Sequence, residues 1–477
     1  MNYLTRKAKI ISTLGPATNT KEQVVKLMKA GMNIARLNFS HGSYKTHLQN
    51  IKNVRDAEEE VGRPVAIIQD LQGPKIRIGR VRDGQVEIKN GDKLVITIQE
   101  LLGDEFRVST SYQNLPNDVE KGDRILIDDG VLELKVSKKT AKEVHCIVIN
   151  GGILKANKGI NLPGINVSAP TLTEKDKADL LFGLQNGVDY IALSFVRDPK
   201  DINVVKDIIT KAGKKTPVIA KIERLEAIQQ IDEIIQVTDV ILIARGDLGV
   251  ELPTEDVPII QKDIIRKCNA QGVPVITATQ MLESMITTPR PTRAEASDVA
   301  NAIFDGTDCV MLSGETASGK FPIEAVKMMD KIIRTTEFEI YKQGKENKNA
   351  AELGTDYSIT DAITFSASQT ATNLKAGAII PLTNSGRNAK KMATQRPHCQ
   401  ILSLTQDKVI QRQLTLYWGV KSFLLETLDE NFSFEKIEKL VTNSIFVSDG
   451  DVVILTASIP FKQQGETNIM KVFKIVK

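Results

Sequence analysis

Two patterns of apolar and polar positions alternate over residues 1–73 and again over residues 168–345. Short apolar runs typical of buried strands are followed by longer segments with apolar residues at helical spacing, such as Lys21–Ala30, Tyr44–Glu60 and Glu174–Asn186. The predicted strands are Ala8–Ser12, Asn33–Leu37, Val65–Leu71, Val188–Phe195, Val218–Ile222, Val240–Ala244, Val273–Ala278 and Cys309–Leu312. Eight strand–helix units predict an α/β fold, a closed parallel (β/α)8 or TIM barrel.

Residues 74–167 interrupt this rhythm with short stretches in which apolar and polar residues alternate. The dipeptides Asn90-Gly91 and Asp129-Gly130 are typical of hairpin turns. The pattern predicts a mostly antiparallel β insertion, which belongs to a different structural class from the barrel.

A polar stretch at residues 342–356 ends the barrel pattern and indicates a linker. The segment that follows, about residues 357–477, alternates helix and strand again. Strands are predicted at Ala378–Leu382 and Val452–Ala457 and a helix at Ser433–Ile445. This segment is expected to form a separate α/β domain.

Polar side chains follow the predicted barrel strands where each strand ends. Because the strands of such a barrel are parallel, their carboxyl ends meet at one rim, which is where TIM-barrel enzymes place their active sites. These rim residues are Arg36, Asn38, Ser40, Asp70, Lys221, Glu223, Asp247, Thr279, Gln280, Ser313 and Glu315.

Three of the rim residues form a candidate metal and phosphate site. Lys221 and Glu223 are two apart in a strand and share one face, and Asp247 follows the next strand. Two carboxylates with substrate oxygens and water are the usual ligands of Mg²⁺, or of Mn²⁺, and a lysine can clamp a phosphate. Two plainer interpretations remain open, a partly buried Lys221–Glu223 ion pair and an N-cap role for Asp247.

Composition narrows the possible partners. The 477 residues carry 63 basic and 59 acidic side chains, a formal net charge of +4, and only 5% aromatic residues, which argues against nucleic-acid binding. No apolar run approaches the roughly 18 residues needed to cross a bilayer, and the N-terminal stretch lacks the apolar core of a signal peptide. The cysteines show no CxxC pair. We expect a cytoplasmic protein without membrane partners.

The segment GETASGK, residues 314–320, matches the first part of a phosphate-binding P-loop and follows an apolar strand. The motif then requires Ser or Thr, whereas Phe321 and Pro322 follow. Pro322 is better interpreted as the first residue of a helix, so the P-loop interpretation is rejected.

Strings spread along nearly the whole chain resemble the pyruvate kinase family. They are MNIARLNFSHG from Met32, DLQGPKIR from Asp70, KGINLPG from Lys158, AKIE from Ala220, ARGDLG from Ala244, TATQMLESM from Thr277, PRPTRAE from Pro289 and MLSGETASGKFP from Met311. The resemblance implies a barrel domain (1–73 and 168–345), a mobile β-barrel-like lid (74–167) and a C-terminal regulatory domain (346–477). It also implies phosphoryl transfer from phosphoenolpyruvate to ADP, giving pyruvate and ATP.

The same resemblance implies roles for the substrate-binding residues. Glu223 and Asp247 would hold the divalent ion, and Lys221 and Arg36 would neutralise the transferred phosphoryl group. The backbone N–H groups of Gly246 and Asp247 would receive the substrate carboxylate, and Thr279 would contact it. Whether Thr279 or a water near Ser313 protonates the enolate stays open. The nucleotide would meet Asn38, His41, Arg77 and Lys158.

One departure from the family concerns potassium. Many pyruvate kinases hold K⁺ at positions matching Asn38, Ser40, Asp70 and Leu71, and those members have DTKGPEIR where this chain has DLQGPKIR. Lys75 therefore places an ammonium where they have a carboxylate, and this charge would disfavour a second cation nearby. We predict that K⁺ is not required; the alternative is that Lys75 is simply a solvated side chain.

In the C-terminal domain, the string TNSGR joins a predicted strand to a helix. The resemblance implies an effector site there, formed by Thr383, Asn384, Ser385, Gly386 and Arg387, and a homotetrameric assembly. The partner loop, residues 458–467, carries Glu466, which argues against fructose 1,6-bisphosphate and leaves another phosphorylated metabolite or AMP. The alternative is an ordinary turn capped by Ser385.

Two other classes of function share some of these residues. A magnesium-dependent barrel aldolase or lyase acting on a pyruvate enolate would use the same two carboxylates, but would leave the insertion and Lys158 unexplained. A nucleotide-binding regulatory protein without catalysis would not need Lys221, Glu223, Asp247 and Thr279 together.

Overall fold

The computed structural model describes residues 6–165, 167–343, 358–425, 434–442, 446–459 and 465–476. Eight strands close into a barrel in the order β1-β16-β15-β14-β13-β12-β3-β2, and each neighbouring pair is parallel. Their bounds are β1 Lys9–Leu14, β2 Ile34–Asn38, β3 Ala66–Asp70, β12 Tyr190–Leu193, β13 Val218–Ile222, β14 Val240–Ala244, β15 Val275–Ala278 and β16 Cys309–Leu312. The predicted TIM barrel is confirmed.

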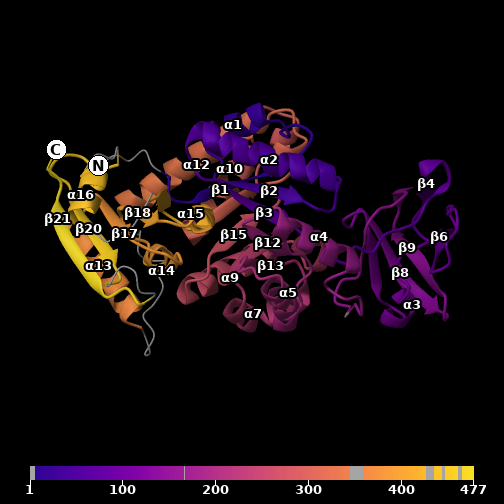
Figure 1. Ribbon diagram of the computed structural model, residues 1–477. Helices are drawn as coiled ribbons and strands as arrows, with labels where there is room; N and C mark the ends of the chain where they lie inside the picture. Colours follow the sequence, from indigo (N-terminus) through magenta and orange to yellow (C-terminus); the bar gives the residue numbers. More distant parts are fainter. Residues whose placement is uncertain are drawn as a thin grey trace.

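Helices surround the barrel (Figure 1). They are α1 Lys21–Ala30, α2 Tyr44–Val61, α4 Glu174–Gln185, α5 Pro199–Lys211, α6 Leu225–Gln229, α7 Ile231–Val237, α8 Arg245–Glu251, α9 Val257–Gln271, α10 Arg293–Asp305, α11 Gly314–Ala317 and α12 Pro322–Lys342. Two short helices, not one, connect β13 to β14, because Gln230, at φ −112° and ψ 24°, separates α6 from α7. Pro322 opens α12, as expected for a helix start.

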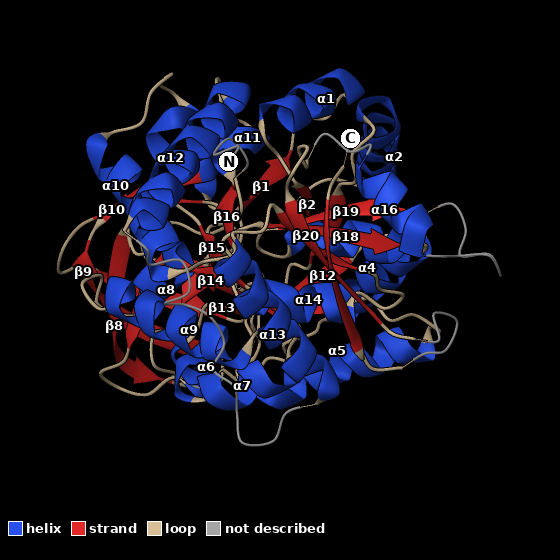
Figure 2. Cartoon of the chain, turned by 90° about the vertical axis from the view of Figure 1, so that its left-hand side faces the viewer, coloured by secondary structure: helices blue, strands red, loops and turns tan. Residues whose placement is uncertain are grey.

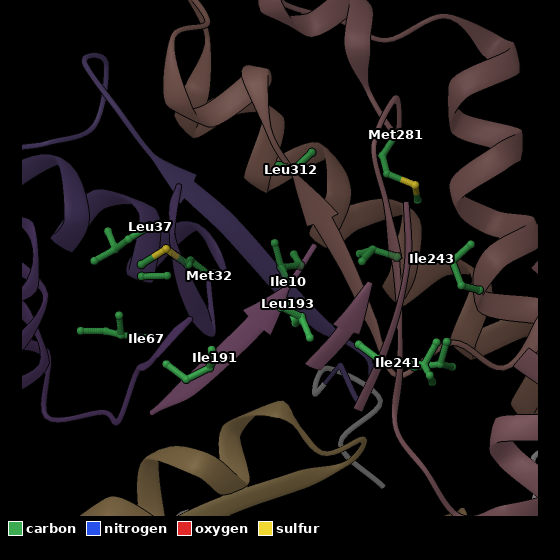
Figure 3. Packing of buried hydrophobic residues seen from close by; sticks show 14 of the residues in the cluster. Ile10, Met32, Leu37, Ile67, Ile191, Leu193, Ile241, Ile243, Met281 and Leu312 are labelled. Atoms are coloured by element: carbon green, nitrogen blue, oxygen red, sulfur yellow. The ribbon is translucent and has the colours of Figure 1, made fainter. Parts of the chain in front are cut away.

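The barrel strands alternate between two apolar layers. Outward side chains such as Ile10, Ile67 and Ile241 pack under the surrounding helices, as Figure 3 shows. Inward side chains such as Ile219 and Leu242 fill the barrel interior. The same alternation makes Lys221 face inward, two residues after Ile219 on β13. The interior is thus apolar at depth and charged near the carboxyl ends of the strands.

The insertion between β3 and α4 contains two sheets, one ordered β11-β7-β8-β9-β5-β6 and one pairing β10 with β4. Its elements are η1 Arg82–Gly84, β4 Gln85–Ile88, β5 Lys93–Thr97, β6 Arg107–Ser109, α3 Leu115–Asp118, β7 Arg124–Ile127, β8 Leu132–Lys139, β9 Glu143–Asn150, β10 Gly152–Lys155 and β11 Ile160–Asn161. Arg77 bridges to Gly159 and Ile78 to Thr110, so one segment joins both edges of the larger sheet in a barrel-like closure.

Only one of the two predicted hairpins forms. Asp129-Gly130 joins the antiparallel pair β7 and β8. Asn90-Gly91 does not make a hairpin, because β4 pairs with β10 whereas β5 pairs with β9 and β6. The chain does not reverse there: β4 and β5 both run antiparallel to the segment that forms β9 and β10, and they belong to different sheets.

The C-terminal domain is a five-stranded sheet ordered β19-β18-β17-β20-β21, in which only β21 is antiparallel to its neighbour. Its elements are α13 Ile359–Leu374, β17 Ala378–Pro381, α14 Arg387–Thr394, β18 Gln400–Thr405, α15 Lys408–Gln413, η4 Leu414–Leu416, β19 Val420–Leu424, α16 Phe434–Thr442, β20 Val452–Ala457 and β21 Ile469–Lys474. Most of the predicted linker, including the boundary at 345/346, lies outside the described residues, as do residues 433 and 443–445 of the predicted helix.

The amino ends of the barrel strands face the C-terminal domain. The Tyr190 hydroxyl, at the start of β12, donates to the Gln413 carbonyl at 2.7 Å, and the Cys309 thiol, at the start of β16, donates to the Leu416 carbonyl at 3.2 Å. Figure 1 shows the insertion on the opposite side of the barrel, and Figure 2 views the molecule from the C-terminal domain. The carboxyl ends therefore open toward the insertion. Within the described ranges, no helix is long and apolar enough to cross a membrane.

Candidate active site

Lys221 lies at the centre of the charged rim of the barrel. Its ammonium is 2.8 Å from the Glu223 carboxylate and 3.3 Å from Asp70, and it donates to the Ser194 hydroxyl at 2.7 Å. The side chain is only 11% exposed. Residues from three neighbouring strands or their ends therefore converge on one buried ammonium.

Arg36 joins the same cluster from β2. Its Nε donates to the Asp70 carboxylate at 2.7 Å, and its Nη1 donates to the Thr13 hydroxyl at 2.9 Å. Asp70 thus lies between two cations, Arg36 and Lys221. Because the guanidinium is planar and makes hydrogen bonds through both Nε and Nη1, its orientation is fixed before a ligand binds.

The charges of the cluster shift one another's protonation. Burial would raise the pKa of Asp70, but the Lys221 and Arg36 charges outweigh it and the pKa is lowered. Burial opposes the charge on Lys221, yet Asp70 and Glu223 raise the pKa of this ammonium above its usual value. Burial raises the pKa of Glu223 despite Lys221, and Asp247 raises it further. Unlike Asp70, Glu223 therefore has surroundings that disfavour its ionised form.

Glu223 and Asp247 fit a divalent cation. Their mutual repulsion is the kind of cost that a bound cation relieves. One Glu223 oxygen accepts the Phe195 backbone N–H at 2.7 Å, which fixes the carboxylate. Among the residues described, no group of three or more His, Cys, Asp or Glu side chains forms a metal cage. A metal here needs ligands from substrate and water, as Mg²⁺ usually does.

Three residues of this rim have a strained backbone. Phe195 (φ 56°), Thr279 (φ 67°) and Gln280 (φ 53°) adopt left-handed conformations that cost non-glycine residues about 1–3 kcal/mol each. The Thr279 hydroxyl donates to the Ala278 carbonyl at 2.6 Å and accepts the Gly246 N–H at 2.7 Å. In this structure the Gly246 N–H expected to meet a substrate carboxylate is therefore bonded to Thr279.

The insertion and the rim enclose a cavity. Its charged lining residues are Lys75, Asp129, Arg197, Arg224 and Asp247. On the insertion side, Lys158 is 2.8 Å from Asp128, and Arg77 donates to the Asn157 carbonyl at 2.9 Å. The structure therefore brings Arg36, Lys221 and Glu223 together, but leaves Arg77 and Lys158 paired within the insertion.

Comparison with known proteins accounts for this combination of barrel, insertion and C-terminal sheet. The family model described as "Pyruvate kinase, barrel domain" matches residues 5–326, and "Pyruvate kinase, alpha/beta domain" matches residues 361–473. The chain belongs to the pyruvate kinase family. It is 47% identical to a pyruvate kinase of Geobacillus stearothermophilus over 476 residues, covering 98% of this chain and 80% of the relative.

Other relatives agree. Pyruvate kinase 2 of Synechocystis is 48% identical over 479 residues, covering 99% of this chain and 80% of that protein. The crystal structure of a pyruvate kinase from Cryptosporidium parvum superposes with a TM-score of 0.93 at 37% identity, covering 99% of this chain and 97% of the other. The aldolase alternative is not supported by these relatives.

The positions that hold potassium in many pyruvate kinases already have partners within this chain. Asn38 Oδ1 accepts the Ser40 N–H at 3.1 Å, and the Leu71 carbonyl accepts the Ser194 hydroxyl at 2.8 Å. Lys75 is exposed, and its ammonium has no hydrogen bond or ion pair among the described residues. His41, which is predicted to meet the nucleotide, accepts through its carbonyl a hydrogen bond from His47 at 2.9 Å.

The predicted effector loop, residues 383–387, lies at the start of α14. Asn384, Ser385 and Arg387 are exposed, whereas Thr383 is buried. The N-cap is Gly386 (φ 80°) and not Ser385, as the alternative predicted; the Ser385 hydroxyl accepts the Arg387 N–H at 3.5 Å. Residues 460–464 of the partner loop lie outside the described residues.

Sequence reasoning missed two residues that orient side chains of the candidate site. Ser194 holds Lys221, and Thr13 holds Arg36. Both stand at the carboxyl end of a barrel strand, which was the available signal. The predicted strands ended at Phe195 and Ser12, so Ser194 was placed within a strand and Thr13 was passed over.

Proposed function

We propose that this chain transfers the phosphoryl group of phosphoenolpyruvate to ADP, the last step of glycolysis, at the rim where Arg36, Asp70, Lys221 and Glu223 meet. The observation that carries the proposal is the buried Lys221 ammonium, held by three oxygen-bearing side chains of the barrel. A permanent cation in a dry, pre-organised site stabilises negative charge far better than one in water.

Glu223 and Asp247 are proposed to hold the divalent ion, Mg²⁺ or Mn²⁺. When bound, such an ion would neutralise the substrate carboxylate and phosphate. The Phe195 N–H keeps one Glu223 oxygen engaged, so the other oxygen is the one directed at Lys221. The chain itself thereby limits how this carboxylate can turn.

Lys221 and Arg36 are proposed to act on the phosphoryl group in flight. A terminal oxygen of ADP bonds to phosphorus as the bond from phosphorus to the enol oxygen breaks, and the enolate then takes a proton at its methylene carbon. This transition state is loose, so catalysis consists largely of positioning and charge neutralisation. Lys221 lies on the inner face of β13 and Arg36 on that of β2, so both face one space.

Thr279 and the N–H groups of Gly246 and Asp247 are proposed to bind the substrate carboxylate. The short Thr279–Gly246 hydrogen bond supports this, because a carboxylate can replace the Thr279 oxygen as the acceptor. The proton donor to the enolate is left as either Thr279 or a water near Ser313.

The nucleotide is proposed to meet Asn38 and His41 on the barrel and Arg77 and Lys158 on the insertion. Closure of the insertion as a lid would bring Lys158 onto the phosphates and exclude water. Lys158 pairs with Asp128 in this structure, so nucleotide binding would exchange one anionic partner for another. The proposed lid comprises residues 74–167, and the proposed C-terminal regulatory domain comprises residues 346–477.

Three further features are proposed. K⁺ is not required, and Asp70 supports this because it already has two cationic neighbours. A phosphorylated metabolite or AMP binds at residues 383–387, supported by the exposed Asn384, Ser385 and Arg387 at the start of α14. The chain assembles as a homotetramer.

The deciding experiment is a coupled assay for pyruvate formation from phosphoenolpyruvate and ADP with Mg²⁺. Turnover that requires both substrates and the metal supports the proposal. Absence of phosphoenolpyruvate- and ADP-dependent pyruvate formation in a folded preparation would refute it.

A further inference from the structure

Two arginines of the barrel rim hold the segment through which the chain returns from the insertion. Arg197 donates to the Val167 carbonyl at 2.6 Å and to the Thr171 hydroxyl at 2.8 Å. Arg224 donates to the Ile165 carbonyl at 2.9 Å. The return segment is therefore attached to the carboxyl ends of β12 and β13 through side chains.

Arg224 has a second contact that Arg197 lacks. Its Nη1 is 3.3 Å from Glu251, whose side chain is only 2% exposed, and its Nη2 is 3.2 Å from Glu226. Both Glu251 carboxylate oxygens are buried, and within the described part of the chain neither has a hydrogen bond of normal geometry, although the Gly164 N–H of the return segment lies close enough to favour the ionised form. Burial raises the pKa of Glu251 to about 7 even though Arg224 opposes this. An ionised carboxylate in this position depends on Arg224.

The two partners sit on the elements that carry the proposed metal ligands. Arg224 directly follows Glu223, and Glu251 is the last residue of α8, whose first turn contains Asp247. α8 is short, so a displacement of its end is transmitted to its start. Arg224 thus touches the return segment, the end of β13 and α8 at once, and it lines the cavity between the insertion and the rim.

We propose that Arg224 and Glu251 are a positioning pair that couples the placement of the insertion to the placement of Asp247 beside Glu223. Neither residue is a ligand of substrate or metal. The inference rests on the proposed function, since it assumes that Asp247 and Glu223 hold the divalent ion and that the insertion closes on the nucleotide. Breaking the pair should weaken metal and nucleotide binding together.

The test uses the full chain with Arg224→Gln, Glu251→Gln and the double variant. We expect each single variant to raise both the half-saturating Mn²⁺ concentration and the KM for ADP by about tenfold. Because the pair acts as one unit, the double variant should be no worse than either single variant. Arg224→Lys should restore part of the loss. Glu251→Gln is the milder change, since it leaves Arg224 with Glu226 and no unpaired buried charge.

Matched controls separate a coupling role from a purely structural one. Glu226→Gln should leave both constants within about twofold, because Glu226 does not bridge to α8. Arg197→Gln should raise the KM for ADP but add independently to Glu251→Gln, because Arg197 contacts the return segment and not Glu251. Additive losses in the Arg224/Glu251 pair, or unchanged constants in both single variants, would overturn the inference.

Failure of the inference is distinguishable from failure of the proposed function. If Asp247→Asn loses Mn²⁺ binding while the Arg224 and Glu251 variants do not change it, the positioning role is wrong and the metal site stands. If Asp247→Asn binds Mn²⁺ as the unmodified protein does, the metal site itself is wrong and the coupling falls with it.

Discussion

The ammonium of Lys221 lies 2.8 Å from the carboxylate of Glu223, two residues further along the inner side of the barrel. Both side chains are almost fully buried. Lys221 is also tied to Asp70 and Ser194, and Glu223 to the Phe195 N–H, so neither can turn freely. This buried salt bridge thus holds a cation and an anion in fixed positions. The cation can stabilise a phosphoryl group, and the anion can bind its metal ion.

Replacing Lys221 by Met should lower kcat by at least about 10²–10³-fold, because a preorganised charge that stabilises the transition state is removed. The fold should persist, since Met fills much the same volume. The coupled assay measures the loss, and circular dichroism checks the fold. Turnover near that of the unmodified protein would contradict the role of Lys221.

Replacing Glu223 by Gln should weaken Mn²⁺ binding by at least about 100-fold, since even changes outside the ligand shell cost 10–100-fold. Titration followed by electron paramagnetic resonance measures this. Asp232→Asn is the matched control, because Asp232 is an exposed carboxylate that pairs with Lys267 on the outside of the barrel. Equal affinities in the two variants would rule out Glu223 as a ligand.

Activity should be nearly independent of K⁺. In choline buffer, which contains no K⁺, the enzyme should retain most of its turnover. The reason is that the Lys75 ammonium, at the start of the insertion, would supply the positive charge that K⁺ otherwise provides. Lys75→Glu should reverse this and produce activation by K⁺. A many-fold rise of the unmodified enzyme on adding K⁺ would show that the ammonium does not replace the ion.

The effector loop should bind a phosphorylated metabolite or AMP. Thermal-shift titration with a panel of such compounds should raise the melting temperature for at least one of them. Arg387→Ala should abolish that shift while leaving basal turnover unchanged, because Arg387 is exposed at the start of α14 and remote from the rim. A panel without any shift counts against an effector at this loop.

Lys9 should make stability rise with pH. It is buried where β1 meets the C-terminal domain, it donates to the Val420 carbonyl at 2.5 Å, and burial lowers its pKa from 10.5 to about 7. Between these values the unfolded chain binds a proton that the folded chain does not. The free energy of unfolding should therefore increase with pH in this window, by at most about 1.4 kcal/mol per unit.

Denaturant unfolding of the unmodified protein and of Lys9→Met at pH 7 and pH 9 isolates this contribution. The stability advantage of the unmodified protein over the variant should be larger at pH 9. An advantage that stays constant between the two values would mean that Lys9 keeps its proton in the folded state.

Local periodicity was sufficient for the barrel and for the identity of most rim residues. Strands such as β13 and β14 begin and end where their apolar runs do, because each strand is buried on both faces. In a parallel barrel the functional polar side chains lie at the carboxyl ends of the strands, so the chain direction shows where to look for them. Lys221, Glu223, Asp70 and Arg36 could therefore be selected from the chain alone, before any distance was known.

Contacts between distant segments were decided only by the tertiary structure. Asn90-Gly91 looks like a hairpin turn, yet its two strands enter different sheets. Ser194 and Thr13 became relevant only when β12 and β1 were placed beside β13 and β2. Arg224 and Glu251 are separated by a strand and several helices along the chain, so no periodicity links them. Sequence patterns report how each segment packs, whereas these pairings depend on the closure of the barrel and the docking of the insertion on its rim.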